Sequence, residues 1–421
     1  MLYFCGVLQQ EEKDLMKKIK LHLQYFGTYQ FQNKLWFSNG GFNGLFSIDL
    51  SDYSLEFRKM ISYLDKKIQW PYYGNIHCTY ENKLFLFPFN CNQIMIHDFQ
   101  CNDIQELPIT PMNNSNIYMT AGIFQINNRV WIFPGDMSAG LWILDLKRLH
   151  LERDIQLAAV LKDVRYIYNY ENVIQVSEEE VAILSGMDTI VQINILKKQI
   201  VYSRYFGEDI HIWSIKYDGK NFWLLLYEST FVYEWKTESD ELVKYELLEQ
   251  DTEWIDIPGP PYINMVFFDN KLILLPSRLK SLMRIDKETN TIRKVVDYPE
   301  GFKFLKNQFG IERYPAFGAF DIVDNKLILH PLLGNMMLIY NVEENHIEGI
   351  EFIVTQDEVP YLNEIILKQT YQETDIYVEK DDFGGVEMLW LMANNKNSEY
   401  RKNGKRYGIG EEIHHIICEV N

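Results

Sequence analysis

Residues 82–98 read NKLFLFPFNCNQIMIHD, and this stretch decides the fold. A polar pair, Asn82-Lys83, precedes an apolar run, a loop with a proline follows, and a second apolar run ends at Asp98. Short apolar runs bounded by turn residues predict strands that are buried on both faces. An Asp at the end of a strand predicts a tight turn, because its side chain accepts hydrogen bonds from the backbone just ahead.

The same pattern is repeated along the chain. Its opening pair stands at Asn33-Lys34, Asn82-Lys83, Asn128-Arg129, Asn270-Lys271 and Asn325-Lys326, with weaker copies at Glu179-Glu180 and Lys220-Asn221. Some 16 residues after the opening pair, six copies end their second apolar run at Asp49, Asp98, Asp145, Asn194, Asp286 and Asn341, whereas the fifth copy has Trp235 there. The copies are about 49 residues apart, a spacing typical of four-stranded propeller blades.

Each repeat is interpreted as four strands. The apolar second strand is flanked by a first strand such as GNIHCTY (74–80), by the strand that ends at Asp or Asn, and by a more polar fourth strand. No long amphipathic helix is predicted between residues 27 and 352, which disfavours a parallel sheet with crossover helices. The fold class is therefore all-β, a seven-bladed β-propeller, with six or eight blades as variants and a pair of β-sandwiches as the alternative.

The two ends of the chain depart from the repeat. In residues 1–26, the alternating stretch IKLHLQY (19–25) is a candidate strand for completing the last blade and closing the ring. Residues 353–421 form a predicted C-terminal extension whose two short helices pack on the propeller. Its apolar residues at helical spacing are Phe383, Val386, Trp390 and Ala393, and then Ile409, Ile413, Ile416 and Ile417. The basic stretch from Lys396 to Arg406 is interpreted as a solvated loop.

The composition narrows the class of protein. Hydrophobic residues make up 47% of the 421 residues and aromatic residues 14%, which excludes a disordered chain. A net charge of −18 disfavours nucleic-acid binding. Five irregularly spaced cysteines indicate a reducing compartment, and neither a signal peptide nor a membrane span is predicted, so a cytoplasmic protein is expected. The oligomeric state stays open.

The repeats resemble those of degenerate kelch-like propellers from bacteria, in which an Asn-Lys-hydrophobic pattern followed by a proline recurs. The first copy also has the double glycine Gly40-Gly41, but the other six copies lack it. The resemblance covers about residues 27–352. It implies the propeller fold and leaves activity open, because kelch-like propellers include binding scaffolds and a few enzymes.

No motif predicts a reaction. The nine histidines form no metal-binding pair, and the chain lacks a nucleophile elbow and a phosphate-binding glycine loop. No cofactor, no metal and no identifiable catalytic residue are therefore expected.

The candidate site is the funnel face, where the loops from second to third strands and the connections between blades gather around the axis. Prolines in four of these loops, Pro88, Pro134, Pro276 and Pro331, are interpreted as rigid turns that end the second strands. The candidate ligand-binding residues are Trp70, Tyr72, Tyr73, His77, Asp136, Trp213, Tyr227, Glu228, Tyr262, Arg278, Tyr314 and His330. Such an aromatic, mixed-charge rim suits a sugar or a peptide, although each aromatic side chain could instead pack between blades.

Two hypotheses on function follow. The favoured one is a non-enzymatic binding or scaffolding propeller that recognises a protein segment or a glycan through the funnel face. The alternative is a carbohydrate-active lyase or hydrolase at the mouth of the central channel, using His77, His330, Arg278 or a rim carboxylate.

Overall fold

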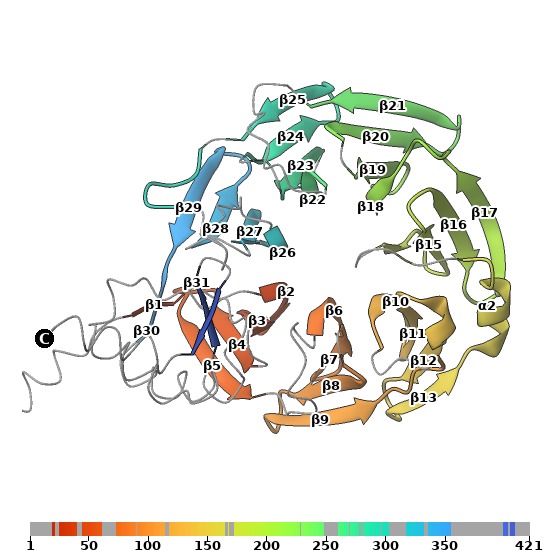
Figure 1. Ribbon diagram of the computed structural model, residues 1–421, viewed down its shortest axis with the longest axis horizontal. Coiled ribbons are helices and arrows are strands. Elements are labelled where there is room, and N and C mark those ends of the chain that lie inside the picture. The colour runs from red at the N-terminus through yellow and green to blue at the C-terminus, as the bar shows by residue number, and fades with distance from the viewer. Residues whose placement is uncertain are drawn as a thin grey trace, which may run out of the picture.

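Seven four-stranded antiparallel sheets make up the ring of the computed structural model (Figure 1). The structure describes residues 19–21, 25–39, 44–60, 73–89, 91–113, 118–164, 167, 172–227, 229–247, 260–268, 270–277, 279, 281–295, 297–302, 317–331, 336–354, 399–402 and 405–408. Each sheet is a meander of four consecutive strands, so each blade comes from one continuous segment. The prediction of an all-β, seven-bladed propeller is confirmed.

The blades follow one another in chain order. Blade 1 contains β2 (Tyr25–Phe31), β3 (Lys34–Asn39), β4 (Gly44–Asp49) and β5 (Leu55–Met60). Blade 2 contains β6 (Tyr73–Tyr80), β7 (Lys83–Pro88), β8 (Gln93–Asp98) and β9 (Asp103–Pro108). Blade 3 contains β10 (Thr120–Ile126), β11 (Arg129–Pro134), β12 (Trp142–Asp145) and β13 (His150–Arg153). Blade 4 contains β14 (Val173–Gln175), β15 (Glu180–Ser185), β16 (Thr189–Asn194) and β17 (Gln199–Tyr205).

The remaining three blades repeat this order. Blade 5 contains β18 (Ile212–Tyr217), β19 (Phe222–Leu226), β20 (Phe231–Lys236) and β21 (Glu241–Glu246). Blade 6 contains β22 (Tyr262–Phe268), β23 (Lys271–Pro276), β24 (Met283–Asp286) and β25 (Thr291–Lys294). Blade 7 contains β26 (Phe317–Val323), β27 (Lys326–Pro331), β28 (Met337–Asn341) and β29 (His346–Ile350). The first strand of each blade lies nearest the axis and the fourth lies at the rim (Figure 1).

The ring closes where β2 of blade 1 lies beside β26 of blade 7. Blade 7 has four strands of its own, so the N-terminal strand does not complete it. Instead, β1 (Ile19–Leu21) pairs antiparallel with β30 (Phe352–Val354), which follows blade 7 in the chain. This two-stranded sheet joins the segment that precedes the ring in the sequence to the segment that follows it.

The predicted tight turns are present in all six copies that end in Asp or Asn. In blade 2, Asp98 Oδ1 accepts hydrogen bonds from the backbone N–H of Gln100 and of Cys101. The same side-chain-to-backbone bond is made by Asp49, Asp145, Asn194, Asp286 and Asn341. The fifth copy differs because Trp235 is buried and its indole donates to Asp240.

The burial of the strands follows the predicted gradient from axis to rim. The second strand β7 is buried from Leu84 to Pro88, whereas the fourth strand β9 alternates between exposed and half-buried residues. The four loop prolines each end a second strand and are buried, which confirms that they are rigid strand ends.

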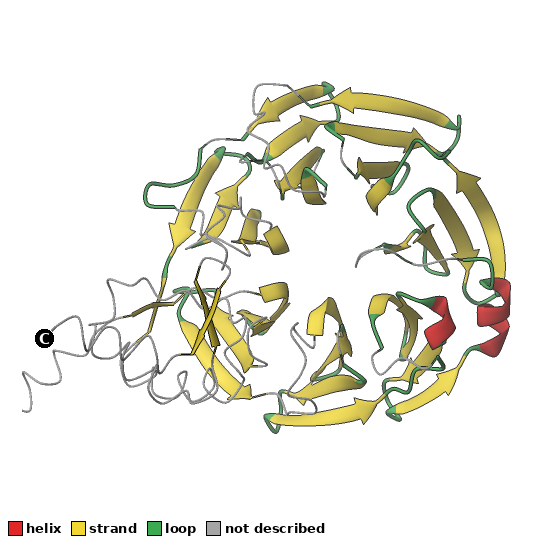
Figure 2. Ribbon diagram, viewed as in Figure 1, coloured by secondary structure: helices red, strands yellow, loops and turns green. Residues whose placement is uncertain are grey.

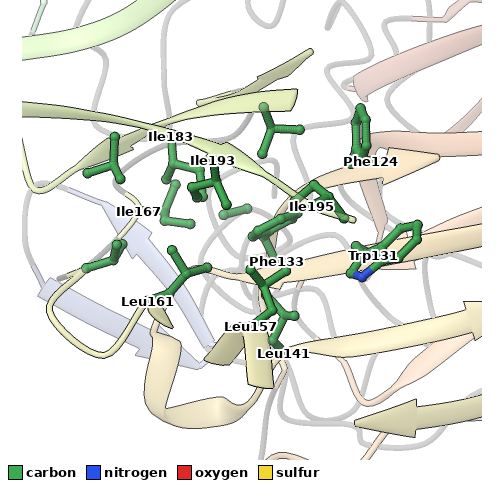
Figure 3. Packing of buried hydrophobic residues seen from close by; sticks show 14 of the residues in the cluster. Phe124, Trp131, Phe133, Leu141, Leu157, Leu161, Ile167, Ile183, Ile193 and Ile195 are labelled. Carbon is green, nitrogen blue, oxygen red and sulfur yellow. The ribbon is translucent and has the colours of Figure 1, made fainter. Parts of the chain in front are cut away.

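The hydrophobic core lies between neighbouring blades. Between blades 3 and 4, Phe124, Trp131 and Phe133 pack against Ile183 and Ile193 (Figure 3). Two short helices were not predicted, η1 (Met137–Ala139) and α2 (Ile155–Val160), both visible in Figure 2. Neither helix reaches two turns, so neither is long enough to show a helical period of apolar residues in the sequence. The helix α2 contributes Leu157 to the same core.

Three successive pairs of blades share one kind of polar contact. An indole N–H donates to a carboxylate, and a cation from the neighbouring blade contacts the same carboxylate. The three sets are Trp131, Asp154 and Lys198 between blades 3 and 4, Trp235, Asp240 and Arg204 between blades 4 and 5, and Trp223, Asp218 and Lys287 between blades 5 and 6. These contacts fix each blade against the next.

The predicted C-terminal helices lie outside the described residues. The basic stretch is not an irregular loop throughout, because part of it forms a hairpin of β31 (Glu399–Lys402) and β32 (Lys405–Gly408). Alternation in these short strands was too brief to be recognised in the sequence.

Candidate functional site

The structure describes seven of the twelve candidate residues of the funnel face. In each meander, the loop from second to third strand lies at the same end as the connection to the next blade. Five candidates lie outside the described residues, namely Trp70, Tyr72, Glu228, Arg278 and Tyr314. The other seven are Tyr73, His77, Asp136, Trp213, Tyr227, Tyr262 and His330.

Tyr73 and Tyr262 occupy the same place in their blades and are buried. Tyr73 pairs with Pro88 at the start of β6, and Tyr262 pairs with Pro276 at the start of β22. Their exposed fractions are 2% and 3%, and both belong to hydrophobic clusters between blades. Phe317 stands in the same position opposite the strand-ending proline of blade 7. An aromatic residue that fills this position in several blades serves the packing between blades. Aligning the repeats on the proline would have revealed this recurrence in the sequence.

The two candidate histidines are engaged in different contacts. The His77 ring lies 5.3 Å from the Tyr29 ring, between the first strands of blades 1 and 2. His330 is buried, and its Nε2 lies 3.2 Å from Asp321 Oδ2. The same Asp321 oxygen accepts a hydrogen bond from the Thr28 hydroxyl of blade 1. His330 therefore belongs to a polar contact that joins the first and last blades.

Asp136 stabilises its own loop. Its Oδ1 accepts a hydrogen bond from the backbone N–H of Ser138 at the start of η1, and its Oδ2 accepts one from Asn113 Nδ2. The side chain is half-buried. Its carboxylate holds two adjoining loops of the funnel face together.

Trp213 and Tyr227 are brought together on blade 5. Their ring centroids are 5.7 Å apart and the planes are inclined by 36°, and both side chains are half-buried. Tyr227 follows the second strand β19, and its backbone N–H donates to the carbonyl of His211. The pair lies at the funnel end of the blade, where β18 begins and β19 ends.

A β-bulge sets the direction of Trp213. The pairing of β18 with β19 skips Trp213 between Ile212 and Ser214, so this residue has no partner residue on β19. Its indole N–H donates to the carbonyl of Ile263 in blade 6. Its own carbonyl accepts a hydrogen bond from Asn172 Nδ2, whose Oδ1 accepts one from the N–H of Ile215.

Asn172 is a positioning residue that the sequence did not reveal. It is completely buried and connects blade 4 to the bulge of blade 5 through both ends of its amide. A lone asparagine outside a motif carries no signal in a single sequence. Repeat alignment does mark Trp213, because the equivalent bulge residues are the smaller Ala121 and Ile263.

The chemistry of this site favours contact over reaction. The indole N–H is already hydrogen-bonded to a protein carbonyl, so the ring offers a ligand its apolar surface. Glu208 and Asp209 are exposed in the connection that leads to β18, so this connection is negatively charged. Among the described residues, no group of three or more His, Cys, Asp or Glu side chains could hold a metal ion. In the same parts of the chain, no helix is long and apolar enough to cross a membrane.

The fold and this site define the class as a seven-bladed β-propeller with an aromatic pair on its funnel face. No family model matches the chain, and no curated protein matches it, so the kelch resemblance stays a prediction. Solved structures do match. The extracellular domain of the putative one-component system BT4673 from B. thetaiotaomicron is 14% identical, with 80% of this chain and 41% of that chain covered and a TM-score of 0.49.

Two further structures are similar at the same level. YCF48 bound to D1 peptide is 10% identical, with 76% of this chain and 91% of that chain covered and a TM-score of 0.49. PorZ, a surface component of the type-IX secretion system of Porphyromonas gingivalis, is 11% identical, with 80% and 39% covered and a TM-score of 0.47. The chain spans about two fifths of the length of the BT4673 domain and of PorZ. At these identities the likeness concerns the fold alone.

Proposed function

We propose that this chain is a binding propeller that holds a protein segment against Trp213 and Tyr227 on its funnel face. The observation that carries the proposal is the pair itself, two large half-buried rings fixed at the end of blade 5 by a bulge and by hydrogen bonds from two neighbouring blades. Rigid aromatic side chains lose little conformational entropy on binding, and they commonly dominate binding energy at interfaces.

The surroundings of the pair favour a particular kind of segment. The apolar ring faces suit an apolar or proline side chain, and the exposed carboxylates of Glu208 and Asp209 suit a basic residue beside it. The net charge of −18 attracts a basic segment over a longer distance. A peptide with an apolar side chain next to Lys or Arg is therefore the expected ligand.

The alternative of a carbohydrate-active enzyme has less support from the described residues. It relied on His77, His330, Arg278 or a rim carboxylate. Arg278 lies outside the described residues, and the two histidines pack in different blade interfaces. General acid–base catalysis needs groups that converge on one substrate atom. We therefore favour binding over catalysis.

The test is selection from a library of displayed random linear peptides, followed by titration of the enriched peptides against purified variants. We expect apolar–basic peptides whose affinity falls at least about tenfold in Trp213→Ala and in Tyr227→Ala. Tyr217→Ala is the matched control, since Tyr217 lies at the other end of the same strand, away from the funnel face. Enriched peptides that bind Trp213→Ala as tightly as the unmodified chain would overturn the proposal, as would a glycan array that yields ligands where the peptide library yields none.

A further inference from the structure

The outer edge of blade 4 differs from the other outer edges of the ring. Its strand β17 is the longest of the seven fourth strands, at seven residues. An outer strand leaves a row of backbone N–H and C=O groups without a partner strand, and proteins commonly protect such edges with charged side chains.

Six of the seven edges follow this rule. Their charged residues are Glu56 and Arg58 on β5, Asp103 and Glu106 on β9, Glu152 and Arg153 on β13, Glu241, Lys244 and Glu246 on β21, Arg293 and Lys294 on β25, and Glu348 on β29. The strand β17, QIVYSRY, has only Arg204. This guanidinium pairs with Asp240 and lies over the Trp235 ring of blade 5, so it serves the contact between blades rather than the edge.

The unprotected edge is apolar. Ile200, Val201 and Tyr205 are 45%, 47% and 55% exposed. The bulge in β17 leaves Val201 without a partner residue on β16, since Ile200 pairs with Ile193 and Tyr202 with Gln192. Leu196, just before the strand, and Ile155 of α2, which contacts β17, extend the exposed apolar surface. Figure 1 shows β17 and α2 together at the outer rim, away from the axis.

The charges beside this edge are arranged with opposite signs at its two ends. Lys197 and Lys198 precede β17, whereas Glu208 and Asp209 follow it, and residues 195–206 contain no Asp or Glu. An antiparallel copy of the same segment would bring the lysines of each chain near the carboxylates of the other. A parallel copy would bring like charges together, and the remaining surface of a chain with a net charge of −18 repels a second copy.

We propose that β17 is an interface between two copies of this chain, which pair antiparallel, edge to edge, around a two-fold axis. The sheet of blade 4 then continues into the blade 4 of the second copy, with Ile200, Val201 and Tyr205 buried at the centre. Opposite charges at both ends fix the direction of pairing. This interface lies at the rim and does not include the Trp213–Tyr227 pair, although it shares Glu208 and Asp209 with the proposed peptide site.

The first experiment measures the molar mass of the full chain by light scattering after gel filtration, over roughly 1–100 µM. We expect a species of twice the 50.1 kDa chain mass. The double variant Val201→Lys/Tyr205→Lys is expected to be monomeric throughout this range. Ile322→Lys is the matched control, because Ile322 is an apolar residue of similar exposure, 48%, on another strand, and this variant is expected to remain dimeric.

The second experiment tests the direction of pairing. Lys197→Glu places an acidic residue opposite Glu208 and Asp209 of the copy, so we expect the dissociation constant of the dimer to rise at least about tenfold. Adding Glu208→Lys and Asp209→Lys in the same chain is expected to restore dimerisation. A monomeric unmodified chain, a dimer that survives the double lysine variant, or a charge reversal without rescue would each overturn the proposal.

Discussion

Replacing Lys198 with methionine tests whether the polar contacts between blades stabilise the ring. The carboxyl group of Asp154 is 1% exposed and accepts hydrogen bonds from Trp131 Nε1 at 3.1 Å, from the Leu157 N–H at 3.0 Å and from Lys198 Nζ at 2.7 Å. Methionine retains the length of the lysine stem but lacks the charge. The variant therefore leaves a buried carboxylate with two neutral donors and no cation.

The size of the effect follows from the burial of the two partners. Removing one member of a fully buried ion pair costs about 3–5 kcal/mol, and an exposed pair contributes about 0.2–1 kcal/mol. Asp154 is buried but the Lys198 side chain is 32% exposed, so we expect a loss of about 2 kcal/mol. For a ring of about 330 residues, this corresponds to a fall in melting temperature of about 3 °C.

The loss should also depend on pH. Burial works to raise the pKa of Asp154, but the hydrogen bonds from Lys198, Leu157 and Trp131 outweigh it and hold the pKa below its ordinary value. A carboxyl whose folded-state pKa is lowered contributes its full stability above its unfolded pKa of about 3.9, and that contribution is lost as the pH falls through the folded-state pKa. The difference between Lys198→Met and the unmodified chain should therefore be constant near neutrality and shrink in acid.

The assay is thermal unfolding by circular dichroism at several pH values, with Lys147→Met as the matched control. Lys147 is exposed and lies in the equivalent turn of blade 3, between β12 and β13. We expect this control to melt within about 1 °C of the unmodified chain. Equal melting temperatures for the two variants would refute the reasoning, as would a difference that persists unchanged after Asp154 is protonated.

Two further predictions concern other contacts between blades. Gly122→Ala should destabilise the protein by about 1–3 kcal/mol, because the new Cβ would lie 2.4 Å from Val173 Cβ of blade 4, and an unchanged denaturation midpoint would contradict this. Thr28→Val should lower stability by about 2 kcal/mol, because it removes the hydroxyl that donates to Asp321 where blade 1 meets blade 7. Thr79→Val, at an exposed position on a first strand, is its control and should leave the melting temperature unchanged.

The fold could be predicted because its signals are local and repeated. The Asp98 turn and the apolar run before Pro88 each depend on a few adjacent residues, and seven imperfect copies reinforce one another. The helix α2 was missed because its cap is a single residue, Asp154, and its one buried face is too short to show a period. The strand at 19–21 was predicted but its partner was not, because β30 lies more than 300 residues away in the sequence.

The candidate site was harder to predict because the same residue types, above all Tyr and Trp, occur both in ligand-accessible loops and in the packing between blades. Tyr73 and Trp213 looked equivalent in the sequence, as aromatic residues of the connections between blades. The structure buries Tyr73 opposite Pro88 and leaves Trp213 half-buried on a bulge. Trp213 lies one residue further along its strand than the position that Tyr73 occupies, and this shift cannot be recognised in a single copy of the repeat.

The repeat itself supplies a criterion for separating structural from functional residues in this molecule. A residue type that returns at the same blade position, such as the aromatic residue opposite the strand-ending proline in blades 2, 6 and 7, satisfies the packing between blades. A feature confined to one blade cannot be explained by that shared requirement. Blade 5 has the large bulge residue Trp213, and blade 4 has the uncharged stretch from Gln199 to Ser203. Each of these two features differs from the equivalent positions in the other blades. For this reason the proposed peptide site is based on Trp213 and the proposed dimer interface on the stretch from Gln199 to Ser203.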